Sequence, residues 1–334
     1  MVAVTRSVDP DTQVLKPPAS SVWLVVDEDK LGTLNQGIGL LEAMGLDYRL
    51  FSMECPAVLR LFPRALWPLS LLTTVQTSMP LSPPWPNVVV GAGTVGTLAA
   101  ANIRKASRNT TVAIALQNPR MNLKLFDWVI APAHDNLWGE NVLQTLGCLH
   151  TLTPKRLSET VLAFQDRWSA LPQPLVAVLV GGPSRHFRFG KKEALTFAHD
   201  LKRLHHETGC GFLLNFSRRT PQLVRQILGA LSKEIPMFQW DGKGKSPYAA
   251  LLQAADYILV TKDSVSMLSD AAATDKPIFV YPLPGNSSKF EAFHQQFAQQ
   301  GVSRPFTGKL EYWARAPFLE TQRVAETLRQ HLNL

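Results

Sequence analysis

The sequence predicts an α/β protein with two doubly wound domains, each built on a mainly parallel sheet. Short apolar runs alternate with amphipathic helical patterns along the chain, and polar or glycine-rich turns follow most of the apolar runs. The chain has 334 residues, of which 46% are hydrophobic. This length suits two domains of about 150 residues better than one hydrophobic core.

The expected domain boundaries follow from composition. Residues 1–20 contain three prolines and no hydrophobic period, so they are expected to form a loose tail. The first domain is expected over residues 21–170 and the second over 175–316, with the proline-containing segment 171–174 as the linker. Residues 317–334 show a helical spacing and are expected to form a helix that packs back on the first domain.

The first domain begins with an apolar strand, and a polar turn over residues 27–34 leads into a helical pattern of Ile38, Leu41 and Leu46. A second strand, the glycine-rich turn 91–96 and a helix over 97–106 follow, and a further helix is expected over 154–168. The expected strands are residues 22–26, 87–90, 112–116 and 128–130.

The second domain repeats this alternation. Its expected strands are residues 175–180, 211–216, 235–238, 257–260 and 277–281, and its expected helices are 191–206, 220–232, 246–255 and 265–273. The segment 256–280 is the clearest unit, because it combines a buried strand, a polar turn, a helix and a second buried strand. It therefore predicts a βαβ unit.

Charge and composition limit the partners. Residues 171–334 carry 20 Lys and Arg against 13 Asp and Glu, a net charge of +7, which favours a polyphosphate ligand or an anionic surface. No long basic run or zinc-finger spacing supports nucleic-acid binding. No apolar run of membrane-spanning length and no signal peptide is seen, so we expect a cytoplasmic protein. The three cysteines are expected to be free thiols, and no metal site is expected.

Residues 59–86 are rich in leucine and proline and include Trp67 and Trp85. They are expected either to pack as a short helix under a loop or to form a peripheral contact with a membrane or a partner. In the second case the protein would lie at the inner face of the membrane.

The turn after residue 260 predicts an anion site. It places Thr261, Asp263, Ser264 and Ser266 where a strand ends and a helix begins, and unpaired N–H groups at such a position attract anions. Asp270 lies about 9 Å further along the helix, at roughly 1.5 Å per residue. A phosphate at the turn and a hydroxyl-bearing group at Asp270 would suit a nucleotide.

Two neighbouring strand ends carry similar chemistry. After the expected strand 175–180, Gly181 and Gly182 could let backbone N–H groups approach a phosphate, although a tight turn without a ligand would show the same pattern. After the expected strand 211–216, Arg218 and Arg219 could bind phosphate or form surface salt bridges. The candidate phosphate-binding residues here are Gly181, Gly182, Ser184, Arg185, Ser217, Arg218 and Arg219.

The first domain offers fewer chemical signals. The turn 91–96 resembles a dinucleotide fingerprint, but Gln117 stands where an acidic residue would bind the ribose, so a nicotinamide cofactor is disfavoured. His134 and Asp135 follow a strand and could act as a base and its partner, or be structural.

A series of motifs recurs in a fixed order along the chain: Gly32, Asn35-Gln36, Gln117-Asn118-Pro119-Arg120, His134-Asp135, Gly181-Gly182-Pro183-Ser184-Arg185, Ser217-Arg218-Arg219, Pro247-Tyr248 and Thr261 to Met267. These ordered motifs resemble the mitochondrial-fission "elongated mitochondria" family over about residues 22–325. This resemblance implies a GT-B glycosyltransferase-like fold, in which two Rossmann-like domains face each other across a cleft and a nucleotide-sugar, UDP-linked by preference, binds mainly to the second. No permanently bound cofactor is implied.

The resemblance also implies roles. Gly32, Asn35, Gln36, Asn118 and Arg120 would face the acceptor, and Met267 would join the nucleotide side. The family favours Glu at the position of Asp270. The Asp270 side chain is one methylene shorter, so it reaches less far toward a ribose. The leading hypothesis is a glycosyltransferase that acts on an envelope lipid or glycan. The alternative is a non-catalytic scaffold that recruits a membrane or a partner, as plant members recruit a dynamin-related protein; an epimerase would need two acidic groups in the cleft.

Overall fold

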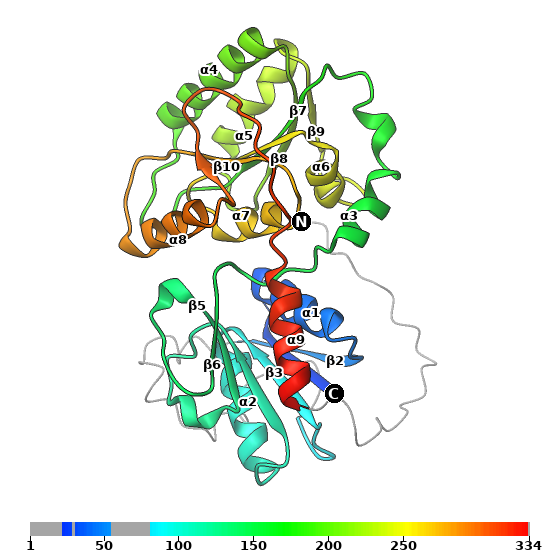
Figure 1. The fold of residues 1–334 in the computed structure, drawn as a ribbon, viewed down its shortest axis with the longest axis vertical. Coiled ribbons are helices and arrows are strands. Elements are labelled where there is room, and N and C mark those ends of the chain that lie inside the picture. Colours follow the sequence, from blue (N-terminus) through cyan, green and yellow to red (C-terminus); the bar gives the residue numbers. More distant parts are fainter. Residues whose placement is uncertain (1–21, 29–30, 55–80, 333–334) are drawn as a thin grey trace.

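The computed structural model describes residues 22–28, 31–54 and 81–332, which form two six-stranded sheets. All strand pairs in both sheets are parallel. Helices cover the sheets, and the two sheets lie one above the other with helix α9 beside the lower one (Figure 1). The predicted α/β fold with two doubly wound sheets is confirmed.

The first sheet has the strand order β2-β1-β3-β4-β5-β6. The inner strands are short runs of apolar residues because helices cover both faces of the sheet. The strands are β1 (Val22–Asp27), β2 (Tyr48–Met53), β3 (Val88–Ala92), β4 (Val112–Leu116), β5 (Trp128–Pro132) and β6 (Val142–Thr145).

The second sheet has the order β12-β11-β10-β7-β8-β9. β7 and β10 are its central pair, so the loops that follow these two strands lie side by side at the carboxyl edge. The strands are β7 (Leu175–Val180), β8 (Gly211–Phe216), β9 (Met237–Gln239), β10 (Tyr257–Thr261), β11 (Ile278–Tyr281) and β12 (Arg304–Pro305).

Helices connect the strands in the order expected for doubly wound sheets. They are α1 (Leu31–Ala43), α2 (Gly93–Ala106), α3 (Pro154–Val161), α4 (Lys191–Thr208), α5 (Gln222–Gly229), α6 (Tyr248–Ala254), α7 (Val265–Ala272), α8 (Ser288–Gln299) and α9 (Glu320–Leu332). Short 3-10 turns add η5 (Ala133–Asp135) and η6 (Gln165–Arg167).

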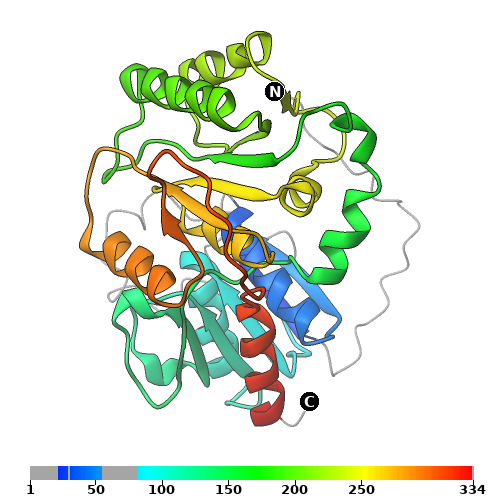
Figure 2. The same ribbon diagram turned by 45° about the horizontal axis from the view of Figure 1, so that its top comes forward.

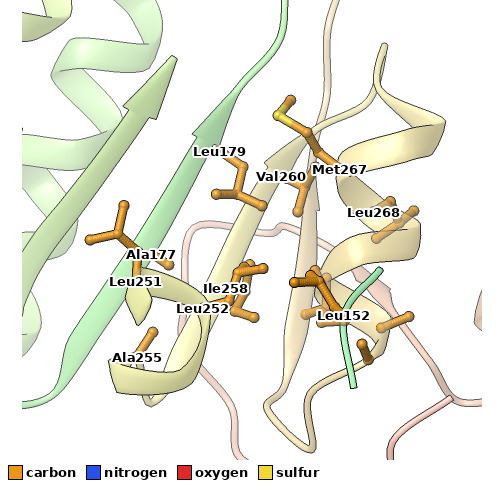
Figure 3. Close-up of a cluster of buried hydrophobic side chains, with 14 of the residues drawn as sticks. Leu152, Ala177, Leu179, Leu251, Leu252, Ala255, Ile258, Val260, Met267 and Leu268 are labelled. Carbon is orange, nitrogen blue, oxygen red and sulfur yellow. The ribbon is translucent and has the colours of Figure 1, made fainter. Parts of the chain in front are cut away.

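One core of the second sheet lies between the sheet and helices α3, α6 and α7. Leu179 and Val260 from the sheet meet Leu251 and Leu268 from the helices (Figure 3). Leu152, from the segment that crosses between the sheets, joins the same cluster. The burial of this crossing segment ties α3 to the second sheet.

Helix α9 returns from the second sheet to the first. Val324, Ala325 and Leu328 are buried against Leu40 and Leu41 of α1, and both views show the two helices side by side (Figures 1 and 2).

Polar contacts connect α9 to the crossing segment as well. The carboxylate of Glu320 accepts the N–H of Leu146 at 2.9 Å, and Thr321 exchanges two hydrogen bonds with the backbone of His150. Two crossing segments, one before α3 and one before α9, therefore join the two sheets.

His150 makes the stability sensitive to acid. Burial lowers its pKa from 6.5 to about 4. As the pH falls from about 6.5 to about 4, the unfolded chain takes up a proton that the folded chain excludes, so the free energy of unfolding should decrease by at most about 3 kcal/mol at this residue.

Urea unfolding at pH 7.5 and 4.5 measures this. The loss of stability between the two pH values should be smaller in His150→Gln than in the wild type, whereas the exposed control His199→Gln should keep the wild-type difference. An unchanged pH dependence in His150→Gln would contradict the assignment.

The structure corrects several expected elements. The segment 27–34 is not a turn throughout, because α1 already begins at Leu31. The helix expected over 154–168 ends at Val161 and is followed by η6. Three strands were not predicted, β2, β6 and β12, nor was α8.

Among the described residues, no helix is long and apolar enough to cross a membrane. The surface expected over residues 59–86 lies mostly outside the described residues. Of its last part, Leu81 and Trp85 pack against the core of the first sheet, where Trp85 meets Trp23 edge to face at 6.1 Å.

Candidate functional site

A cavity of about 390 Å³ lies between the two sheets, with walls from both halves of the chain. It is here called the central cavity. The first half contributes residues that follow β4, β5 and β6, and the second contributes the loop after β7, the start of α7 and the start of α8. The lining residues are Gln117, Pro132, His134, Asp135, Cys148, Ser184, Arg185, His186, Val265, Lys289 and Phe290.

The second half supplies positive charge to the central cavity. Arg185 is exposed, and its Nε donates to Nε2 of His186 at 2.8 Å; no carboxylate within the described residues pairs with it. Lys289 forms an ion pair across the cavity with Asp135 of the first half. An anion that enters the cavity would thus meet one guanidinium and one ammonium group.

The start of α7 adds backbone donors. Val265, its first residue, lines the central cavity. Within the described chain, the N–H groups of Val265 and Ser266 donate to no intramolecular acceptor, whereas the Ser264 hydroxyl caps the helix by accepting the N–H of Met267 at 3.3 Å. Free N–H groups at a helix N-terminus favour an anion.

His134 is buried beside Phe293, with ring centroids 5.5 Å apart. Burial, and then the nearby charge of Lys289, lower its pKa to about 4. The imidazole is therefore neutral at pH 7 and only a weak base. Asp135, its neighbour, lines the cavity as a carboxylate oriented by Lys289.

Cys148 also lines the central cavity, but it is not a nucleophile. Burial, and then the nearby Asp270, raise the pKa of the thiol to about 12. The thiol therefore stays protonated at pH 7. Its backbone N–H donates to the hydroxyl of Ser269 at 2.9 Å, which holds the first half against α7.

The loop with Gly181 and Gly182 does not offer its first N–H groups to a ligand. The N–H of Gly181 donates to Thr261 Oγ1 at 2.8 Å, and the N–H of Gly182 donates to Asp263 Oδ2 at 3.0 Å. A Cβ on Gly181 would come within 2.2 Å of the Asp263 carboxylate. The glycines serve close packing of two loops, so the expectation that their N–H groups bind phosphate is not met.

Asp263 connects three loops of the second sheet. Besides Gly182, its buried carboxylate accepts the hydroxyl of Thr261 at 2.7 Å and the guanidinium of Arg219 at 2.8 Å. Arg219 also donates to the carbonyl of Gly182 at 3.2 Å. Arg219 thus uses one donor of each terminal nitrogen within the protein, while its side chain stays 47% exposed.

The two residues before Arg219 differ in exposure: Ser217 is partly buried and Arg218 is exposed. Arg218 is exposed and has no ion pair within the described ranges. Ser217 lies 3.2 Å from Thr220 through their hydroxyl oxygens, and its carbonyl accepts from Arg225. Neither Ser217 nor Arg218 lines the central cavity.

Asp270 lies on α7, and its carboxylate accepts the hydroxyl of Tyr248 at 3.0 Å. Burial raises the pKa of Asp270 to about 7. Neither Asp270 nor Tyr248 lines the central cavity. Of the predicted residues on the same helix, Met267 is buried in the core and Ser266 is exposed. The structure therefore joins Asp270 to the tyrosine of the Pro247-Tyr248 motif.

The predicted acceptor-side residues lie on two elements of the first half. Gly32, Asn35 and Gln36 are within α1, and Gln36 approaches the cavity residue Gln117 at 3.4 Å. Asn118 and Arg120 lie in the turn after β4, where the Asn118 side chain accepts the N–H of Arg120 at 2.9 Å. None of the five lines the central cavity.

The glycine-rich turn 91–96 is closed by the protein itself. The carboxylate of Asp27 accepts the N–H groups of Thr94 at 2.8 Å, Val95 at 2.8 Å and Gly96 at 3.1 Å. This carboxylate occupies the place where a dinucleotide phosphate would sit at a helix N-terminus. The closure gives a physical reason against a dinucleotide at this turn.

Four predicted site residues meet in the central cavity, namely His134, Asp135, Ser184 and Arg185. Sequence reasoning missed Lys289, Phe290, His186 and Val265 as lining residues. The loop before α8 follows β11 at the same sheet edge as the assigned loops, so its position was the available signal. Within the described ranges, no group of three or more His, Cys, Asp or Glu residues could hold a metal ion.

Comparison with known proteins supports a family assignment. The profile of the family described as Mitochondrial fission ELM1 matches residues 31–332. The chain belongs to this family. It is 30% identical to the Mitochondrial fission protein ELM1 of Arabidopsis thaliana over 275 residues, which cover 74% of this chain and 64% of that protein. The match thus spans less than two thirds of the plant protein. An uncharacterized protein of Rickettsia prowazekii (strain Madrid E) is 26% identical over 94% of this chain and 99% of its own length.

Solved structures show the same fold. A UDP-GlcNAc 2-epimerase from Methanocaldococcus jannaschii superposes with a TM-score of 0.56 at 14% identity and covers 93% of this chain and 99% of its own. A UDP-N-acetylglucosamine 2-epimerase from Rickettsia bellii gives a TM-score of 0.50 at 12% identity and covers 94% and 96%. The ELM1-family chain therefore has the expected GT-B-like fold.

Proposed function

We propose that the central cavity binds a nucleoside diphosphate sugar, UDP-linked by preference, and that the protein is a metal-independent glycosyltransferase. The observation that carries this proposal is the convergence of Arg185, Lys289 and the first turn of α7 on one cavity between two GT-B sheets. A diphosphate would neutralise these groups. The net charge of +7 on residues 171–334 agrees with an anionic ligand.

The Lys289–Asp135 ion pair suggests how a donor would prepare the site. A diphosphate would compete with Asp135 for the ammonium group and free the carboxylate, which faces the same cavity. Asp135 would then accept the proton of an acceptor hydroxyl, whose oxygen forms the new bond to the sugar as the bond to the diphosphate breaks. Arg185 and Lys289 would stabilise the negative charge on the leaving diphosphate.

The lining favours transfer over epimerisation. Asp135 is the one carboxylate among the described residues of the cavity wall, whereas an epimerase needs two acidic groups. Asp270 is bonded to Tyr248 outside the wall. An envelope lipid or glycan remains the proposed acceptor, and a peripheral membrane contact through residues 59–86 remains part of the proposal.

Removal of Arg185 tests the proposal. Arg185→Ala should weaken UDP binding at least about tenfold, which corresponds to about 1.4 kcal/mol, because one charge-assisted contact to phosphate is lost. Isothermal calorimetry with UDP and a UDP-sugar measures the change. Arg188→Ala, an exposed arginine outside the cavity wall, is the matched control and should bind like the wild type.

The scaffold alternative predicts a different result. If neither UDP nor another nucleoside diphosphate binds to the wild-type protein, the transferase proposal is wrong. Loss of partner or membrane recruitment on deletion of residues 59–86, without any nucleotide binding, would then favour a scaffold on an inherited GT-B fold.

A further inference from the structure

Two connections of the first sheet contain no α-helix. The chain passes from β4 to β5 through the 3-10 turn η4 (Leu123–Leu125), and from β5 to β6 through η5 and residues 136–141. These two connections, residues 117–127 and 133–141, are here called the β5 loops. Parallel strands are usually joined by a helix that covers the sheet. Here the core of the first sheet is covered instead by partly exposed loop side chains, namely Met121, Leu123, Leu125 and Leu137.

Trp138 is the most exposed apolar residue of the β5 loops. It is 75% exposed, and its ring packs against no other aromatic ring of the described chain. The residue before it, Leu137, belongs to the partly exposed cover of the core. Exposed apolar surface that continues from one side chain to the next is typical of a binding face, whereas a single exposed residue would need no explanation.

The backbone on both sides of Trp138 is held in place. The side-chain amide of Gln144 donates to the carbonyl of Leu137 at 2.9 Å. The side-chain amide of Asn141 donates to the carbonyl of Leu123 at 2.9 Å, which joins the two β5 loops. The exposure of Trp138 is therefore a property of the fold.

The β5 loops also carry free positive charge. Arg120 and Lys124 are exposed, and neither forms an ion pair within the described ranges. The carboxylates of Asp127 and Asp135 are already ion-paired, so Glu140 is the remaining free acid. Two free cations thus stand against one free carboxylate, and the face is complementary to an anionic surface.

We propose that the β5 loops bind an anionic lipid surface. Trp138 lies at the level of the lipid head groups, where the amphipathic indole ring is favoured. Arg120 and Lys124 contact the lipid phosphates, and the partly exposed leucines border the contact. This face is separate from the contact proposed for residues 59–86.

The contact would bring the central cavity close to the bilayer. Trp138 follows the cavity residue Asp135 by three positions, which span at most about 10 Å. An acceptor held in the membrane would then reach the cavity from the side of the first sheet. This consequence rests on the proposed transferase function, whereas the lipid contact itself does not, because Trp138, Arg120 and Lys124 lie outside the cavity lining.

Cosedimentation of the full chain with lipid vesicles tests the inference. We expect saturable binding to vesicles of phosphatidylcholine and phosphatidylglycerol at about 3:1, and binding at least about fivefold weaker to pure phosphatidylcholine. Binding should also weaken as NaCl is raised from about 0.1 M to about 1 M. Trp138→Ser should weaken binding at least about tenfold through loss of apolar contact, and the double variant Arg120→Gln with Lys124→Gln should do so through loss of charge.

Two control variants match these changes on the second half of the chain. Tyr312→Ser removes an aromatic side chain of nearly equal exposure, since Tyr312 is 74% exposed. Lys191→Gln with Lys192→Gln removes two exposed cations at the start of α4. Both controls should bind the mixed vesicles like the wild type. UDP binding by Trp138→Ser should also equal that of the wild type, so a failure of this inference is distinct from a failure of the nucleotide site.

Three results would overturn the inference. Equal binding of the wild type to mixed vesicles and to pure phosphatidylcholine, or to neither, would leave the β5 loops as a face for a protein partner. Wild-type vesicle binding by Trp138→Ser would place the lipid contact elsewhere on the chain. An equal loss in Tyr312→Ser would mean that exposed aromatic residues act without regard to position. Because Trp138 is exposed, Trp138→Ser is expected to fold, and its circular dichroism spectrum checks this.

Discussion

Replacement of Asp263 by alanine is expected to lower the free energy of unfolding by about 3 to 5 kcal/mol. The carboxylate is buried and accepts hydrogen bonds from Gly182 after β7, Thr261 at the end of β10 and Arg219 after β8. Without it, the N–H and hydroxyl donors lose their acceptor, and the guanidinium loses its counter-charge. Urea unfolding of the wild type and of Asp263→Ala measures the difference in the free energy of unfolding.

The same substitution should weaken nucleotide binding. Asp263 does not line the central cavity, but it holds the loop that carries Ser184 and Arg185 through Gly182. Asp275→Ala is the matched control, because Asp275 is exposed and is expected to change stability by no more than about 0.5 kcal/mol. A loss below about 1 kcal/mol in Asp263→Ala would contradict the role of this carboxylate.

Asp27→Ala is the second change with a large expected effect, a loss of about 2 to 4 kcal/mol in the free energy of unfolding. The substitution removes the acceptor of three N–H groups at the start of α2. These groups are buried or half-buried, and a negative charge at a helix N-terminus is additionally favourable. Thermal or urea unfolding measures the loss.

The neighbouring Glu28 gives the control for Asp27. Glu28 is exposed at the end of β1, so Glu28→Ala should unfold like the wild type. If Asp27→Ala unfolded like the wild type, the conclusion that this carboxylate satisfies the N–H groups at the start of α2 would be wrong.

Much of the fold could be predicted because buried parallel strands are nearly continuous apolar runs. β7 and β8 were placed at their observed bounds, and β10 and β11 within one residue. β2 was missed because it is an edge strand of mixed polarity, and β12 because it has only two residues. Helix α8 was missed although Phe290, Phe293 and Phe297 recur at helical spacing.

The site was harder to predict because hydrogen-bond partners depend on tertiary contacts. Glycines after β7 have the same pattern whether they approach a phosphate or a carboxylate of their own chain. Here Asp263, 81 residues further along, takes the N–H of Gly182. Likewise, two adjacent arginines differ in role only because Arg219 reaches that carboxylate and Arg218 does not.

The central cavity itself could be expected only in part. Sheet topology places the loops after β4, β5, β7 and β10 at carboxyl edges, which explains why His134, Asp135, Ser184 and Arg185 were found together. The ion pair between Asp135 and Lys289 depends on how the two sheets face each other. That arrangement is set by the two crossing segments and α9. Of these, only the return of the last helix to the first domain was expected from the sequence.

The most direct test of the proposed nucleotide site is a crystal structure of the protein soaked with UDP. The proposal predicts density for the diphosphate in the central cavity, within hydrogen-bond distance of Arg185 and the first turn of α7, with Lys289 turned from Asp135 toward the phosphate. Absence of nucleotide density at a UDP concentration that saturates binding in solution, or density outside the central cavity, would contradict it.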